Sequence, residues 1–240
     1  MTDGLGGSSR FLTGIAELDR VTGGLPGSRL LLVSGEEKSG RTSLVLQICA
    51  IASSQGRDCM IVDSGTGLHI ERMRSVFSAW GADQTRIWVS SPRTLRDQTR
   101  LVLKAAELCG DGGVIAVDEA THLYRLELTG IPQLDKPKYM ELTFQMAALK
   151  EAALRKGILA VVVTEAHEVP VGGTFVTRPV AERITGYFAD MRFWLENLEG
   201  GVKSLSYEVE GLKGTVLVRL TGSGLTSESI SRRTSGRASR

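Results

Sequence analysis

The stretch SGEEKSGRTSL, Ser34 to Leu44, decides the fold because its glycines have the spacing of a phosphate-binding loop. Gly35, Gly40 and Thr42 match the pattern G-x-x-x-x-G-K-[ST], with Arg41 in place of the lysine. An apolar segment precedes the loop and a Leu-, Val- and Ile-rich segment follows it, which predicts strand, loop and helix. This order is the one that a phosphate loop requires, because amides at a helix N-terminus bind anions.

Short apolar segments alternate with helical patterns through most of the chain. The predicted strands are Arg29 to Ser34, Cys59 to Asp63, Arg86 to Val89, Gly113 to Asp118 and Ile158 to Thr164. The predicted helices are Thr42 to Ser54, one with Ile70, Met73, Phe77 and Trp80 on one face, Thr94 to Cys109, and Lys138 to Lys156. These units predict an α/β fold with a mostly parallel, twisted sheet and helices on both faces.

The last third of the chain has a different pattern. Three further strands are predicted, Asp190 to Leu198, Val202 to Val209 and Gly214 to Leu220. Glycine-containing turns separate them, so we expect an antiparallel meander that extends the sheet.

Length and composition are those of one folded unit. With 240 residues and 42% hydrophobic content, the chain can bury a single core. We expect a flexible N-terminus over residues 1–10, a core over residues 11–225 and a basic, disordered tail over residues 226–240. Because the sequence holds no apolar run of 18 residues and no signal peptide, we expect a cytoplasmic protein without membrane partners.

Positive charge is concentrated at the C-terminus. The net charge is +2, yet the last ten residues hold four arginines and no acid, so the rest of the chain carries −2. Attraction to nucleic acid must therefore come from local patches or from this tail. Arg96, Arg100 and Lys104 form a basic stripe on one predicted helix, which is either a solvated outer face or a DNA contact.

Cysteine and histidine usage gives no metal-binding pattern. Cys49, Cys59 and Cys109 are odd in number, far apart and beside apolar segments, which predicts buried free thiols. The three histidines show no ligand spacing with them, so we expect no structural metal.

The candidate nucleotide site combines the loop with a strand-end carboxylate. Its predicted residues are Gly35, Lys38, Ser39, Gly40, Arg41, Thr42 and Asp118. ATP and Mg²⁺ are the candidate cofactors, with Thr42 and Asp118 as the metal ligands. Glu36 and Glu37 place negative charge near the phosphate path, Lys38 stands where glycine is frequent, and a guanidinium cannot enter a lysine pocket. We therefore expect nucleotide binding to be weak or lost.

Several segments carry a family resemblance. They are Phe11 to Asp19 (FLTGIAELD), Gly23 to Gly27, Ala120 to Leu128 (ATHLYRLEL), Arg178-Pro179 and Ile184 to Glu196. Together they resemble the RecA-type ATPase core of archaeal RadA recombinases and especially of their RadB paralogues, over roughly Leu12 to Leu225. The resemblance implies a RecA-like P-loop core and an accessory role in DNA repair and homologous recombination.

The resemblance also implies a site that has lost its chemistry. Active members place a water-activating glutamate after the second strand, where this sequence has Gly65. They place Asn-Gln after the strand that ends at Thr164, where this sequence has Glu165 and Ala166. We therefore expect a pseudo-ATPase. The alternative is a slow DNA-linked ATPase in which Glu119, directly after Asp118, polarises water.

DNA and a recombination protein are the partners that the resemblance implies. Weak binding of single-stranded DNA would use the segments Leu128 to Lys138 and Glu165 to Arg178 and the C-terminal tail. The candidate phosphate contacts are Lys136, Lys138, Arg178, Arg232, Arg233, Arg237 and Arg240. The protein partner would be a RadA-like main recombinase or a Holliday-junction resolvase. A third hypothesis is a protein-interaction regulator unrelated to recombination.

Overall fold

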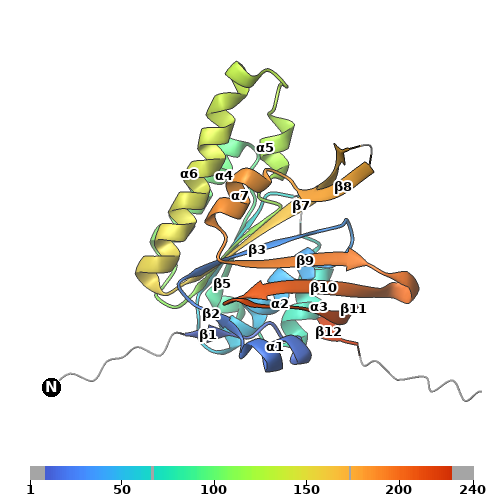
Figure 1. The fold of residues 1–240 in the computed structure, drawn as a ribbon. Helices are drawn as coiled ribbons and strands as arrows, with labels where there is room; N and C mark the ends of the chain where they lie inside the picture. The colour runs from blue at the N-terminus through green and yellow to red at the C-terminus, as the bar shows by residue number, and fades with distance from the viewer. Residues whose placement is uncertain (1–8, 66–67, 173, 229–240) are drawn as a thin grey trace, which may run out of the picture.

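The computed structural model describes residues 9–65, 68–172 and 174–228, and its centre is one large sheet (Figure 1). The strands follow the order β12-β11-β10-β9-β3-β7-β6-β4-β5. Their bounds are β3 (Arg29–Gly35), β4 (Cys59–Asp63), β5 (Ile87–Ser90), β6 (Val114–Asp118), β7 (Leu159–Val171), β9 (Met191–Asn197), β10 (Val202–Val209), β11 (Leu212–Thr221) and β12 (Gly224–Ser227). The strands from β9 through β5 pair in parallel, and β9 to β12 pair antiparallel.

Helices cover both faces of this sheet, as predicted (Figure 1). One face carries α1 (Ala16–Thr22), α2 (Arg41–Ser54) and α3 (Ile70–Ala79), and the other carries α4 (Leu95–Leu108), α6 (Pro132–Lys156) and α7 (Glu182–Phe188). Leu31 and Val33 point into the first core, and Leu30 and Leu32 point into the second. The buried strands are apolar on both sides for this reason, which is the pattern that predicts a parallel sheet.

The long helix α6 begins at Pro132, six residues before the predicted start at Lys138. The carboxylate of Asp135 accepts bonds from the amide and hydroxyl of Thr129, both 2.8 Å, and from the amide of Gly130 at 2.9 Å. These bonds fix the chain at the helix entry. Pro137 lies early in the helix and removes a single backbone bond there.

A motif used twice marks this helix entry. Residues 13–19 read TGIAELD and residues 129–135 read TGIPQLD. In the first copy, the Asp19 carboxylate accepts from the amide and hydroxyl of Thr13 and from the amide of Gly14, at 2.8–2.9 Å. The shared pattern T-G-I-x-x-L-D therefore starts both α1 and α6, and it was the signal for the earlier start of α6.

The segment Glu165 to Arg178, for which no strand was predicted, is mostly a hairpin. β7 continues past the sheet to Val171 and pairs antiparallel with β8 (Thr174–Pro179), so that the hairpin projects beyond the sheet beside α5 (His122–Leu126) (Figure 1). The sequence signal was a run of β-branched residues on both sides of two glycines.

The C-terminal meander is confirmed and gains one strand, β12, which was not predicted. The amide of Glu17 donates to the hydroxyl of Ser227 at 3.0 Å, and Arg219 binds Glu228 through two bonds of 2.9 Å. At the other end, Arg10 lies in β1 (Arg10–Phe11), which pairs with β2 (Leu25–Pro26). The four arginines of the predicted tail lie outside the described residues.

Two further sequence expectations concern the core. Cys49, Cys59 and Cys109 are free and buried, as predicted, and burial raises the pKa of Cys109 to about 12. On α3, Phe77 is buried, whereas Ile70, the first residue of the helix, is exposed. In the described part of the chain, no helix is both long enough and apolar enough to cross a membrane.

Candidate nucleotide site

The loop between β3 and α2 has the backbone of a phosphate-binding loop. Gly35 and Gly40 have φ values of 150° and 102°, in the left-handed region that favours glycine. A Cβ on Gly35 would lie 2.2 Å from the carbonyl oxygen of Leu195, so no other residue fits there. Lys38 also has positive φ, at 59°. The sequence placed this loop correctly, at the N-terminus of α2.

Strands β9 and β10 hold the outer side of this loop. Glu36 accepts bonds from the amide and the side-chain nitrogen of Asn197, at 2.8 and 2.9 Å. The buried Lys203 ammonium donates to the carbonyl oxygen of Lys38 at 3.0 Å. The Glu36 carboxylate is therefore bound to β9. It lies away from the loop interior, where we expected it to repel a phosphate. The Glu37 and Lys38 side chains are exposed and pair with each other.

Arg41 is held by the protein itself. Its guanidinium lies 2.8 Å from a carboxylate oxygen of Glu119 and donates to the carbonyl oxygen of Thr164 at 2.5 Å. The two side chains are only 9% and 16% exposed, so solvent screens this pair little. The positive charge at the lysine position is thus directed to the residue after β6 and to the middle of β7, a contact that the sequence did not reveal.

Glu119 lies beside Gly65, the position at which the resemblance implies a glutamate. An ideal Cβ built on Gly65 would lie 3.2 Å from Cγ of Glu119. A larger residue at position 65 would therefore compete with Glu119 for the same space. Because position 65 is glycine, there is space for the Glu119 side chain. Because position 41 is arginine, the Glu119 carboxylate has an ion-pair partner.

Two adjacent carboxyl groups at the end of β6 have raised pKa values. Burial raises the pKa of Asp118 to about 6, opposed in part by the Thr42 hydroxyl and by Arg41. Burial likewise raises the pKa of Glu119 to about 7, opposed by Arg41 and increased further by Asp118. Removal from water disfavours the charged form of each acid.

Unsatisfied polar atoms gather around this site. Among the described residues, the buried side-chain oxygens without a hydrogen-bond partner are those of Ser39, Ser64, Gln98, Asp118, Glu119 and Thr121. All except Gln98 lie in the loop or directly at the ends of β4 and β6. Buried polar atoms usually have partners, so this cluster fits a polar ligand. Asp118 and Thr42 are oxygen donors of the kind that Mg²⁺ prefers.

Glu165 lies in a second charged group next to the first. It forms an ion pair with Arg125, and its carboxylate lies 3.7 Å from Nδ1 of His122 on α5. Its negative charge also raises the pKa of Glu119. Glu165, at the position where the resemblance implies an asparagine, is therefore bound to α5.

The predicted DNA contacts have different surroundings. Lys136 is exposed and has no ion pair among the described residues, Lys138 lies 3.1 Å from Glu127, and Arg178 lies 3.6 Å from Glu182. Lys136 and Lys138 are on α6 and Arg178 is on β8. The stripe Arg96, Arg100 and Lys104 is exposed along α4.

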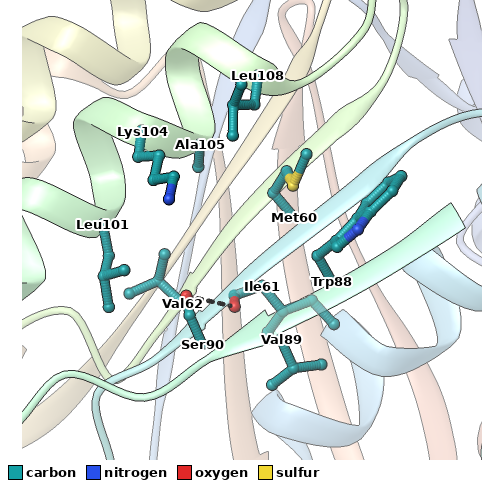
Figure 2. Close-up of a pocket in the computed structure, with 10 residues that line it drawn as sticks. All are labelled: Met60, Ile61, Val62, Trp88, Val89, Ser90, Leu101, Lys104, Ala105 and Leu108. Atoms are coloured by element: carbon teal, nitrogen blue, oxygen red, sulfur yellow. Dashed lines mark hydrogen bonds between the residues drawn. The ribbon is translucent and has the colours of Figure 1, made fainter.

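A separate apolar groove of about 480 Å³ lies between α4 and the end of the sheet. Figure 2 shows Leu101, Ala105 and Leu108 of α4 facing Met60 of β4 and Trp88 of β5, with Lys104 at the rim. β5 is the last strand of the sheet and Trp88 is exposed. A free strand edge beside an apolar groove is an arrangement that can bind an extended peptide.

The glycine-rich loop after β3 and the acid at the end of β6, in a mostly parallel sheet, define a P-loop protein with a RecA-like core. A model of the Rad51 family matches residues 9–204, and the chain belongs to this family. This finding confirms the family resemblance seen in the sequence.

The relatives agree with this assignment. The chain is 26% identical over 174 residues to the DNA repair and recombination protein RadB of Thermoplasma acidophilum, covering 71% of this chain and 73% of that protein. It is 23% identical over 230 residues to the protein of the same name from Methanothermobacter thermautotrophicus, covering 86% of this chain and 97% of that protein. The chain is thus similar to RadB-type recombinase paralogues.

Proposed function

We propose that this protein is a RecA-fold accessory protein in DNA repair and homologous recombination, which binds DNA and hydrolyses little or no ATP. The observation that carries the proposal is the ion pair between Arg41 and Glu119 inside a Rad51-family phosphate loop. It engages the cation that would otherwise face a nucleotide phosphate. The proposed role in DNA repair and recombination is taken from the names of the two RadB relatives.

A nucleotide, where it binds, would use the loop amides, with Thr42 and Asp118 holding Mg²⁺. The partnerless Oδ1 of Asp118 and the hydroxyl of Thr42 fit this role. ATP would supply a phosphate anion for the N-terminus of α2. Arg41 would have to leave Glu119 to reach that anion, so the buried ion pair opposes binding.

DNA would lie along the start of α6 and the β7–β8 hairpin. Lys136 supports this placement because, among the described residues, no acid neutralises it, whereas Lys138 and Arg178 each share a carboxylate. Exposed cations of this kind bind phosphates without reading sequence. The protein partner would be a main recombinase or a Holliday-junction resolvase.

Replacing Lys136 and Lys138 together with alanine is expected to weaken binding of a labelled oligothymidylate and to reduce its salt dependence. Each lost phosphate contact lowers the slope of log K against log salt by about 0.7 for a single strand. Fluorescence anisotropy at several salt concentrations measures both effects. Arg155→Ala is the control, because Arg155 is an exposed residue of α6 that pairs with Glu151. If the affinity of the unmodified protein for the oligothymidylate does not change with salt concentration, the DNA-binding role is refuted.

A slow ATPase is the second candidate. The position of Glu119 beside Gly65 and its pKa of about 7 favour it, because a general base works best near the ambient pH. In that case Glu119→Gln is expected to abolish Mg²⁺-dependent phosphate release while the affinity for ATP rises, because Arg41 no longer has to leave a carboxylate to reach a phosphate. Equal phosphate release by both proteins would exclude Glu119 as the base.

A further inference from the structure

A second cavity, of about 580 Å³, lies between α7, the end of β8 and the strands β3 and β9. We call it the α7–β9 cleft. Tyr187 and Trp194 line it together with three arginines, Arg178, Arg183 and Arg192. Its volume is in the range of about 300–1,000 Å³ that holds small molecules. Aromatic rings beside guanidinium groups are the combination that binds nucleotides of a single strand.

Trp194 lies on a floor of small residues. Its neighbours in register are Ser34 on β3 and Ser206 on β10, and neither side chain is large enough to cover an indole ring. The indole nitrogen donates to Glu196 at 2.7 Å, which fixes the orientation of the ring. A flat ring that is held in place and has small neighbours is suited to stacking with a base.

Tyr187 lies on the opposite wall, on α7. Its side chain is 82% exposed, and its ring packs edge-on against Phe188 with centroids 5.1 Å apart. A large aromatic side chain this exposed has its face available to a ligand. The cleft therefore offers one aromatic ring on the sheet and another on the helix.

The cations of the cleft are not all neutralised. Arg178 lies 3.6 Å from Glu182, and Arg192 lies 3.8 Å from Glu208 and donates to the carbonyl of Gly186. Arg183 is exposed, and neither an ion pair nor a hydrogen bond engages it among the residues that the structure describes. One guanidinium is thus available to an anion, in a lining with three arginines and one carboxylate.

The cleft continues over the meander. A neighbouring cavity of about 460 Å³ shares Arg192 and Trp194 with it and extends across β10 and β11 to Lys213. Arg192 and Trp194 line both cavities, and the second cavity is also lined by Ser206 and Thr215, which carry hydroxyl groups. A surface that combines aromatic rings with guanidinium and hydroxyl groups suits a single strand of nucleic acid.

We propose that the α7–β9 cleft binds single-stranded nucleic acid, with a base stacked on Trp194 or Tyr187 and a phosphate on Arg183. The proposal rests on the DNA-binding function proposed above but adds a site away from the start of α6. Arg178, at the end of the β7–β8 hairpin, lies on its rim. A strand bound to the hairpin can therefore continue into the cleft and onto the meander.

Tyr187→Ala and Trp194→Ala are each expected to weaken binding of labelled oligothymidylate about tenfold, since each removes a stacking surface. Arg183→Ala is expected to lower the salt slope by about 0.7, with Arg155→Ala unchanged. An oligonucleotide that carries 5-iododeoxyuridine is expected to crosslink to Tyr187 or Trp194 under ultraviolet light. Because Tyr187 is exposed, its variant folds normally even if Trp194→Ala does not.

The outcomes separate this proposal from the proposed function. One outcome is that replacing Lys136 and Lys138 weakens oligonucleotide binding, while Tyr187→Ala has no effect and no crosslink forms in the cleft. This outcome would overturn the proposal for the cleft but not the DNA-binding function. A complete lack of oligonucleotide binding would overturn both. Crosslinking that millimolar ATP abolishes would assign the cleft to free nucleotides, and self-association lost in Tyr187→Ala would assign it to a second copy of the chain. Each of these last results contradicts the proposal.

Discussion

Arg41→Ala is expected to lower the free energy of unfolding by about 3 kcal/mol, the scale found when one partner of a buried ion pair is removed. The substitution leaves Glu119 without its guanidinium, in a place where burial already raises its pKa to about 7. The carbonyl of Thr164 loses its donor as well. Urea denaturation at pH 8, above the pKa of Glu119 in the unmodified protein, measures the loss.

The matched control is Arg155→Ala on α6. Arg155 and Glu151 are 70% and 66% exposed, so their pair is expected to contribute less than about 1 kcal/mol. Replacing Arg41 and Glu119 together with leucine should recover much of the loss, because no unpaired charge then remains. If Arg41→Ala costs no more than Arg155→Ala, the internal ion pair does not form in solution, and Arg41 is free to meet a phosphate.

Asp118→Asn is expected to stabilise the protein at pH 8 by roughly 2–3 kcal/mol, and to give no gain at pH 4. The folded-state pKa of Asp118 is raised from 3.8 to about 6, so the folded protein holds this proton more tightly than the unfolded chain. The resulting stability is present below pH 3.8 and is lost as the pH rises through 6. Asparagine keeps the shape and removes the buried charge.

Denaturation in urea at both pH values, with EDTA to remove divalent metals, tests this expectation. Asp111→Asn is the control, since Asp111 is an exposed acid in the turn before β6. A gain for Asp118→Asn that is the same at pH 4 and pH 8 would show that desolvation of the carboxylate is not its cause.

The sheet and the phosphate loop could be predicted because their signals are local. Runs such as Leu30 to Val33 are apolar on both faces, and the loop glycines stand at fixed spacing between a strand and a helix. Each of these features depends on a few consecutive residues. The C-terminal meander was predictable for the same reason, from its glycine turns.

The direction of the Arg41 side chain could not be predicted, because it depends on residues far away in the chain. Glu119 directly follows β6 and Thr164 lies within β7, and only the folded sheet brings them to the guanidinium. The same holds for Glu36, whose partner Asn197 lies in β9. Sequence reasoning gave the type of each charge but not its partner.

The start of α6 was predicted six residues too late, because the contacts that fix the helix entry were not recognised in the sequence. The bonds from Thr129 and Gly130 to Asp135 fix this entry, and they lie before Pro137. The earlier T-G-I-x-x-L-D segment, which ends at Asp19, has the same bonds. Comparing the two segments would have corrected the prediction.

The contacts of Asn197 and Lys203 with the phosphate loop have a consequence for biosynthesis. The loop is made early, yet the residues that hold its outer side lie in β9 and β10, near the end of the chain. A nascent chain that ends before Leu195 lacks all of these bonds, and its Gly35 lacks the backbone of Leu195 against which it packs. The loop can therefore take its final shape only when translation is almost complete.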